Sequence, residues 1–214
     1  MIDQTELTIK LNRVILIEGF QKLSMSKLAQ AVDVSRATLY LYFKNKDEIV
    51  QAVVGRHLRF ISERPIPAEF DASSFITVWL NSLLLMGSTT ETFTTDLQRA
   101  YPELAHELRM ADHDYFTHLI SYVAKAQQAD VVLPIYTPDF VVFQADTLIT
   151  SVLQQVKAHR ITLEQAEQYL SDGISLELQA LLSSTVRKQL DISNFEPMKT
   201  LIFKEFRATY ALIA

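Results

Sequence analysis

The stretch SMSKLAQAVDVSRATLYLYFKNKDE, residues 24–48, has the pattern of two short helices joined by a tight turn. Ser24 stands where its hydroxyl can cap the first helix by accepting a hydrogen bond from an amide of the first turn. Asp33 falls in the turn, where the backbone needs a positive φ that Asp tolerates better than most residues, and Ser35 can cap the second helix. The apolar face of the first helix consists of Met25, Leu28, Ala29 and Val32. The stretch therefore predicts a helix, a turn and a helix around one buried stripe.

The second of these helices has a buried and an exposed face. Leu39 and Phe43 are four residues apart, so they lie on the same inward side. The side chains left for solvent are Arg36, Ala37, Thr38, Tyr40 and Tyr42. A helix pair of this spacing, with Arg, Thr and Tyr exposed on its second member, is typical of a DNA-binding helix-turn-helix module.

Residues 7–54 resemble the tetracycline-repressor (TetR) family of transcriptional regulators. The marks that carry the resemblance are Gly19-Phe20, Leu28-Ala29, Val34-Ser35, Thr38-Leu39-Tyr40, Tyr42-Phe43, Lys46 and Asp47-Glu48. Asp33 departs from the Gly that is usual in the turn, and Tyr42 stands where His is frequent. A Tyr hydroxyl can still reach a phosphate. The resemblance implies an all-α protein, with an N-terminal three-helix helix-turn-helix DNA-binding module and a C-terminal helical domain for ligand binding and dimerisation.

The resemblance also implies roles for the exposed residues. Arg36 and Ala37 are expected at base edges, Arg36 by hydrogen bonds to guanine and Ala37 by apolar contact with a thymine methyl. The residues expected to position the module on phosphates are Ser26, Ser35, Thr38, Tyr40, Tyr42 and Lys46. Lys46 falls in the first turn of a helix, where a cation is unfavourable unless an anion lies near it. The function implied is that of a repressor that binds a palindromic DNA operator as a homodimer and is released by a small-molecule effector.

Two other functions remain open. A relative that has lost DNA binding could act as a co-activator that contacts a protein partner, for which an exposed Leu41 would be suited. Arg36, Tyr40 and Lys46 argue against it, because a protein-binding surface does not need that phosphate-facing set. The other alternative is an all-helical small-molecule carrier or enzyme, which predicts metabolite binding without any effect on DNA affinity.

Composition favours a compact helical protein of the cytoplasm. The 214 residues are 49% hydrophobic and include only four Gly and six Pro, and the lack of Cys excludes disulfides and thiol catalysis. No apolar run approaches the roughly 20 residues of a membrane span, and no secretory signal is recognisable. Residues 1–60 hold nine Lys and Arg against six Asp and Glu, a net charge of +3, so the remainder carries −8 of the total of −5. A small module that meets phosphates beside a larger acidic one has this asymmetry.

Arg64-Pro65-Ile66-Pro67 separates two helical regions, because two close prolines stop a helix. We expect a DNA-binding domain over residues 1–46 and an effector-binding and dimerisation domain over residues 47–214, in which residues 47–62 form a connecting helix. Helices are predicted at residues 3–18, 24–32, 35–43, 45–62, 73–86, 91–99, 102–129, 138–159, 162–182 and 194–212.

Local signals refine these helices. Asn45 with Glu48, and Thr162 with Gln165, have the spacing of capping boxes, while Ser171-Asp172-Gly173 is expected to loosen its helix. Two apolar stripes are predicted, Val141, Ala145, Leu148 and Val152 on one helix and Leu163, Ala166, Leu170, Ile174 and Leu178 on the next. The resemblance assigns these two helices to a four-helix bundle between protomers, but burial inside one protomer explains the stripes equally.

Many large apolar residues follow residue 67, and those that could line an effector pocket are Trp79, Leu83, Met86, Phe93, Leu97, Tyr101, Tyr115, Phe116, Tyr122, Phe140 and Phe143. Ordinary core packing explains them too. The histidines at 106, 113 and 118 do not have the i, i+4 spacing with which two histidines share a metal on one helix. There is no glycine-rich phosphate loop and no nucleophile elbow. We therefore predict no metal, no cofactor and no catalytic residue, and the effector cannot be named.

Overall fold

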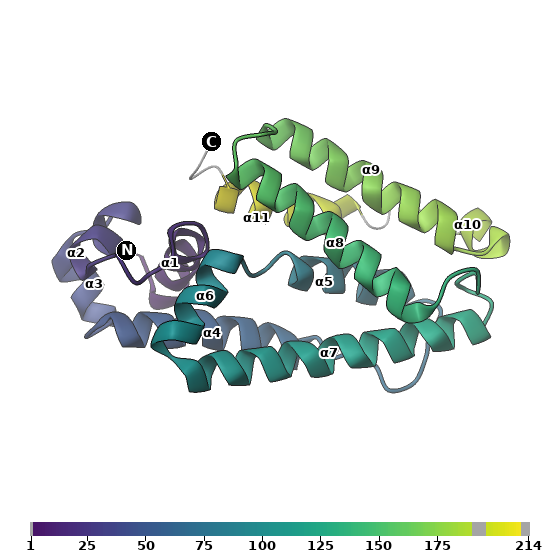
Figure 1. Ribbon diagram of the computed structural model, residues 1–214, viewed down its shortest axis with the longest axis horizontal. Helices are drawn as coiled ribbons and strands as arrows, with labels where there is room; N and C mark the ends of the chain where they lie inside the picture. The colour runs from purple at the N-terminus through teal and green to yellow at the C-terminus, as the bar shows by residue number, and fades with distance from the viewer. Residues whose placement is uncertain (1, 190–195, 211–214) are drawn as a thin grey trace. The chain divides into compact units, whose positions relative to one another are not determined.

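The computed structural model describes residues 2–189 and 196–210, and in these ranges the chain is built from helices without a strand (Figure 1). The helices are α1 (Gln4–Glu18), α2 (Met25–Ala31), α3 (Arg36–Tyr42), α4 (Lys46–Glu63), α5 (Phe75–Met86), α6 (Glu91–Ala100), α7 (Pro102–Gln128), α8 (Pro138–Lys157), α9 (Leu163–Leu181), α10 (Ser184–Gln189) and α11 (Glu196–Tyr210). The all-α prediction is confirmed. The short α10 was not predicted, and residues 194–195 and 211–212 of the predicted last helix lie outside the described ranges.

Contacts divide the described residues into two compact units. Unit 1 holds residues 2–63, 89–112 and 208–210, and unit 2 holds most of the remainder, from Arg64 onward. The first division falls directly before Arg64-Pro65-Ile66-Pro67, where the prolines end α4. Unit 1 is larger than the domain expected over residues 1–46, because α4, α6 and the start of α7 belong to it.

Unit 1 has its core where α1 packs against α2, α4 and α6. The fully buried side chains of this core include Leu7, Leu11, Ile15, Phe20, Leu28, Leu39, Phe43, Ile49, Val54, Phe93 and Leu97. Phe93 and Leu97 come from α6, so the core of the helix-turn-helix region includes a helix that lies far along the chain. Burial of such side chains, rather than the propensity of helices as short as α2 and α3, keeps this region folded.

Side-chain caps fix where several helices begin. Asp3, Ser24, Ser35 and Thr162 each accept a hydrogen bond from an amide of the first turn of the helix that follows. The predicted capping box at Thr162 and Gln165 is present in both directions. At Asn45 only half of the predicted box forms: Asn45 Oδ1 accepts from the Glu48 amide at 2.9 Å, while Glu48 Oε2 accepts from the Lys44 amide at 2.8 Å. The Glu48 carboxylate thus satisfies the amide one residue before the expected one.

Unit 2 is built on α8, which packs against α5 and α9 (Figure 1). The helix α9 runs without interruption through Ser171-Asp172-Gly173, so the expectation of a loosened helix is wrong. Gly173 instead allows close packing, since a Cβ there would lie 2.3 Å from a methyl of Leu148 on α8. Most of the apolar stripe residues, including Val141, Ala145 and Ala166, are buried inside this unit.

Candidate nucleic-acid interface

The turn between α2 and α3 has the predicted backbone. Asp33 has a φ of 55°, which confirms that a residue tolerant of the left-handed region is needed there. The Asp33 amide donates to the Gln30 carbonyl at 3.1 Å, and the Val34 amide donates to the Ala29 carbonyl at 3.0 Å. These bonds close α2 and return the chain so that Ser35 can start α3.

The start of α3 is held by Ser35. Its hydroxyl accepts from the Thr38 amide at 3.0 Å and lies 2.8 Å from the Thr38 hydroxyl. Both side chains therefore have partners within the first turn of α3. The arrangement orients the N-terminal end of the helix, from which Arg36 and Ala37 project into solvent.

Arg36 and Tyr40 form a pair on the exposed face of α3. The Arg36 guanidinium carbon lies 5.3 Å from the centre of the Tyr40 ring, and Nη2 lies 3.5 Å from the Tyr40 hydroxyl. Stacking on an aromatic ring restricts an otherwise flexible guanidinium at a surface position. The cation is therefore presented from one helix face next to Ala37.

Tyr42 and Lys46, two predicted phosphate contacts, have partners inside unit 1. The Tyr42 hydroxyl donates to the Ile2 carbonyl at 2.6 Å. The Lys46 ammonium donates to three backbone carbonyls, those of Phe20 at 3.0 Å, Gln21 at 3.2 Å and Leu23 at 3.2 Å. Three acceptors match the three N–H donors of an ammonium group. The unfavourable place of Lys46 in the first turn of α4 is thus offset by carbonyl oxygens of the chain itself.

The same segment, residues 19–23, is also held by Asp96 of α6. Asp96 Oδ2 accepts from the amides of Phe20 at 2.8 Å and Gln21 at 3.1 Å. Gly19 has a φ of 73°, and a Cβ at this position would lie 2.4 Å from the Asp96 carboxylate. Sequence reasoning missed Asp96, because nothing near residue 96 indicates a partner 75 residues away.

Three candidate pocket residues belong to unit 1. Phe93 and Leu97 are part of its buried core. The Tyr101 hydroxyl donates a hydrogen bond to the Asp47 carboxylate at the start of α4. Burial first, and this carboxylate second, raise the pKa of Tyr101 to about 12. These residues stabilise unit 1, which contains the helix-turn-helix, by core packing and by a hydrogen bond to α4.

The comparisons with known proteins bear on this module. The family model described as bacterial regulatory proteins, tetR family, matches residues 12–53. Residues 12–53 therefore belong to the TetR family of regulatory proteins. An uncharacterized HTH-type transcriptional regulator of Haemophilus influenzae is 47% identical over 45 residues, which cover 21% of this chain and 24% of that relative. This chain therefore matches about a quarter of the relative's length.

Solved structures extend the TetR-family likeness to the fold of most of the chain. A TetR-family transcriptional regulator from Marinobacter aquaeolei VT8 has a TM-score of 0.59 and 15% identity, covering 94% of this chain and 99% of its own. The ketosteroid transcriptional regulator KstR2 of Mycobacterium tuberculosis has a TM-score of 0.60 and 10% identity, covering 85% of this chain and 95% of its own. At these identities the likeness shows the fold. The relatives are transcriptional regulators rather than enzymes.

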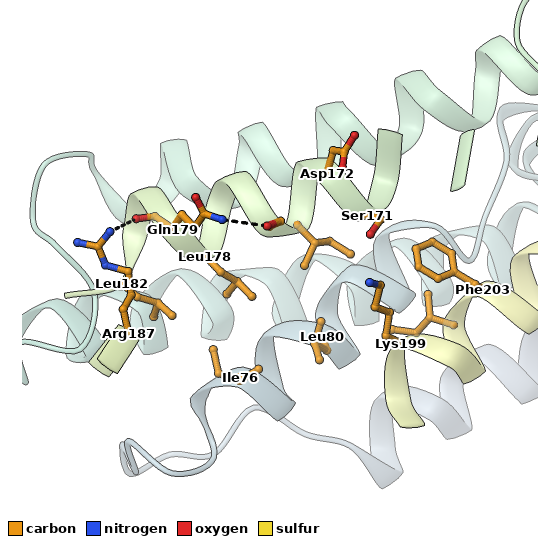
Figure 2. A pocket seen from close by; sticks show the side chains of 13 residues that line it. Ile76, Leu80, Ser171, Asp172, Leu178, Gln179, Leu182, Arg187, Lys199 and Phe203 are labelled. Atoms are coloured by element: carbon orange, nitrogen blue, oxygen red, sulfur yellow. Dashed lines mark hydrogen bonds between the residues drawn. The ribbon is translucent and has the colours of Figure 1, made fainter. Parts of the chain in front are cut away.

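The remaining pocket candidates lie in unit 2 and differ in burial. Trp79, Leu83, Met86 and Tyr122 are buried, Phe116 is half-buried and Phe143 is exposed. Trp79 and Tyr122 both stack on Phe75. The ring centroids of Phe75 and Trp79 are 6.3 Å apart, and those of Phe75 and Tyr122 are 6.2 Å apart. Their role as pocket residues stays a prediction. A pocket of about 350 Å³ in unit 2 is lined by other residues (Figure 2).

The histidine-rich part of α7 also has internal partners. Asp112 Oδ1 lies 2.9 Å from His57 Nε2, and His106 Nδ1 lies 3.3 Å from the Arg109 guanidinium. Within residues 2–189 and 196–210, no three His, Cys, Asp or Glu side chains gather as a metal site would require. No helix in this described part of the chain is long and apolar enough to span a membrane.

Proposed function

We propose that the protein is a transcriptional repressor that binds a palindromic DNA operator as a homodimer and releases it when a small-molecule effector binds. The observation that carries the proposal is the exposed Arg36–Tyr40 pair on a capped α3, within a TetR-family domain. A helix that satisfies its own cap and presents a stacked arginine at its N-terminal end is suited to the major groove.

In this proposal the residues of the DNA-binding surface have three roles. Arg36 and Ala37 read base edges, while Ser26, Thr38 and Tyr40 contact phosphates or their surroundings. Tyr42 and Lys46 act mainly by positioning, because their polar groups already bind carbonyls of unit 1. Their predicted phosphate contacts would then come second to holding α3 and α4 in place.

The dimer is proposed to form through α8 and α9. Their exposed apolar side chains include Phe140, Phe143, Tyr169 and Leu176, of which Phe143 is 65% and Leu176 is 69% exposed. Covering such side chains stabilises an association through the hydrophobic effect. A twofold dimer would present two α3 helices to half-sites about one helical turn, roughly 34–36 Å, apart.

The dimer is tested by sedimentation velocity of Phe143→Glu and Leu176→Glu. The wild type should sediment as a dimer and both variants as monomers. Met110→Glu, at an exposed apolar position on α7, is the matched control and should leave the dimer intact. Dimers that persist in both α8 and α9 variants would place the interface elsewhere.

The effector is proposed to bind in unit 2 and to weaken DNA binding. Linkage then requires DNA to weaken effector binding by the same factor. The helix α4, which ends where unit 2 begins in sequence, is the proposed route of transmission.

DNA binding is tested by fluorescence anisotropy with the duplex that lies upstream of the coding region and a scrambled duplex of equal composition. We expect tighter binding to the upstream duplex and a steep loss of affinity with salt, because phosphate contacts release counterions. Equal affinity for both duplexes across salt concentrations would count against a specific operator at this location.

One observation supports the co-activator alternative. Leu41 on α3 is 81% exposed, which suits contact with a protein partner. Leu41→Ala should leave DNA affinity unchanged if α3 reads DNA. An upstream duplex that fails to bind, together with loss of transcription activation in the Leu41→Ala strain, would favour the protein-partner function.

A further inference from the structure

Unit 2 contains a pocket between α5, α9, α10 and α11 whose volume is about 350 Å³ (Figure 2). This volume lies in the range of small-molecule sites, which run from about 300 to 1,000 Å³. Its lining shares no residue with the pocket candidates taken from the sequence. The four contributing helices belong to unit 2 over the residues that line it.

Most of the lining is apolar. The apolar side chains are Ile76, Leu80, Ile174, Leu178, Leu182, Ile202 and Phe203. Ile76 and Leu80 project from α5 toward α9 in Figure 2, and Phe203 approaches from α11. Hydrocarbon or aromatic groups of a ligand would be removed from water against this surface.

Two cations stand at opposite ends of the apolar surface (Figure 2). The half-buried Lys199 directs its ammonium toward α9 on the side of Ser171. Arg187 donates from Nη1 to the Gln179 carbonyl at 3.0 Å. That bond engages one of the five N–H donors of a guanidinium. Arg187 therefore keeps N–H donors for charge-assisted hydrogen bonds with an anionic ligand, and Lys199 brings a second positive charge to the lining.

Asp172 is the acid in the lining, and it is already engaged. Its carboxylate accepts from Gln168 Nε2 at 2.8 Å. Figure 2 shows Asp172 on α9, away from Ile76 and Leu80 of α5. The charged side chains in the lining are thus two cations and one acid, and the acid lies on the exposed face of α9.

We propose that this pocket binds a small amphipathic organic acid. The carboxylate of the ligand contacts Lys199, and its hydrocarbon part lies against α5 and Phe203. A partly buried carboxylate requires a cationic or hydrogen-bonding partner, which Lys199 supplies, and the apolar lining selects against small hydrophilic anions. The role of this acid as the effector rests on the proposed function above, whereas its binding does not.

The test is isothermal titration calorimetry of the full chain with octanoate and 4-phenylbutyrate, a straight and an aromatic acid. Octylamine and 1-octanol serve as probes with the same chain and a different head group. We expect both or one of the acids to bind, and the amine and the alcohol to bind at least about tenfold more weakly, the factor that a charge-assisted bond supplies. Failure of both acids, or equal binding of octanol, would overturn the proposal.

Two variants locate the binding. Lys199→Gln should weaken acid binding about tenfold and leave octanol binding unchanged. Lys204→Gln, an exposed lysine on the same helix outside the lining, is the matched control and should bind as the wild type does. Ile202→Trp fills the pocket and should abolish binding of the acids, with thermal unfolding used to confirm that each variant is folded. Unchanged affinity in folded Lys199→Gln and Ile202→Trp would contradict this site.

The two proposals fail in different ways. Anisotropy of the operator complex with added octanoate measures release, and calorimetry measures binding. Acid binding without DNA release would uphold the ligand class and contradict the effector step of the proposed function. Specific DNA binding by a protein that takes up neither acid would overturn the ligand class while the regulator function stands.

Discussion

Residues 19–23 of unit 1 and the Trp79–Glu177 region of unit 2 differ in how their buried polar groups are bonded. In unit 1, Lys46 and Asp96 bind the carbonyls and amides of the same segment, residues 19–23. In unit 2, Trp79 Nε1 and Glu177 Oε1 are buried without a hydrogen bond of normal geometry. The bonds of Lys46 and Asp96 hold the connection between α1 and α2, whereas a buried carboxylate without a good partner lowers the stability of the unit that is proposed to respond to a ligand.

The largest effect is expected from Glu177, which is only 6% exposed. Burial raises its pKa from an ordinary 4.5 to about 7, partly opposed by the Trp79 indole and the Gln144 amide. Because the folded-state pKa is the higher one, stability is greatest below about pH 4.5 and is lost as the pH rises toward about 7. The shift corresponds to roughly 3 kcal/mol between those limits.

Glu177→Gln removes this titration. The variant should be more stable than the wild type at pH 8, and the difference should shrink as the pH falls below 7, in urea unfolding followed by circular dichroism. Glu107→Gln, at an exposed position, is the matched control and should follow the wild type. Parallel stability curves for wild type and Glu177→Gln would show that unit 2 does not hold a strained carboxylate.

A smaller effect is expected from Asp96→Ala, which removes the acceptor of two amides. Two hydrogen bonds to a charged acceptor predict a loss of about 2 kcal/mol in the free energy of unfolding. Thr95→Ala, one residue earlier and exposed on α6, should change it by less than about 0.5 kcal/mol. DNA affinity of Asp96→Ala should also fall, because residues 19–23 connect α1 to α2. Unchanged stability and DNA affinity would contradict a structural role of Asp96 in holding residues 19–23.

The smallest effect on stability is expected from the α3 cap. Ser35→Ala should cost about 1 kcal/mol, the usual value of an N-cap hydroxyl, and leave the Thr38 hydroxyl without its serine partner. Ser26→Ala, at an exposed position inside α2, should not change thermal unfolding measurably. Equal melting temperatures for both variants would contradict the structural role of the cap.

The sequence predicts those features that depend on residues close together in the chain. Ser24, Asp33, Ser35 and the Thr162–Gln165 box act over a few residues, so local reasoning found the turn and the caps. The hydrogen bonds of Lys46 and Asp96 with residues 19–23 join residues far apart in the chain. The sequence predicts a phosphate contact for Lys46 but not its three carbonyl partners, because these lie 23 to 26 residues away, and Asp96 has no local signal.

In unit 2, too, the sequence could not predict the contacts that depend on the tertiary structure. The helical spacing predicts that Val141, Ala145 and Ala166 are buried, but it does not distinguish burial within the chain from burial between two chains. In the structure they are buried within the chain. Aromatic residues such as Trp79 and Tyr122 stack through Phe75, which the sequence did not single out. The acid pocket is lined largely by aliphatic residues and two cations from four helices, a set that no short motif indicates.

Arg36 is proposed to read bases, while Lys46 and Asp96 hold the segment that connects α1 to α2. The most direct measurement is the anisotropy of Arg36→Ala with the upstream and scrambled duplexes, beside Arg59→Ala as an arginine control outside α3. We predict that Arg36→Ala weakens binding to the upstream duplex about tenfold or more, with a smaller loss on the scrambled duplex and no change in the free energy of unfolding. An equal loss on both duplexes would contradict a base-reading Arg36.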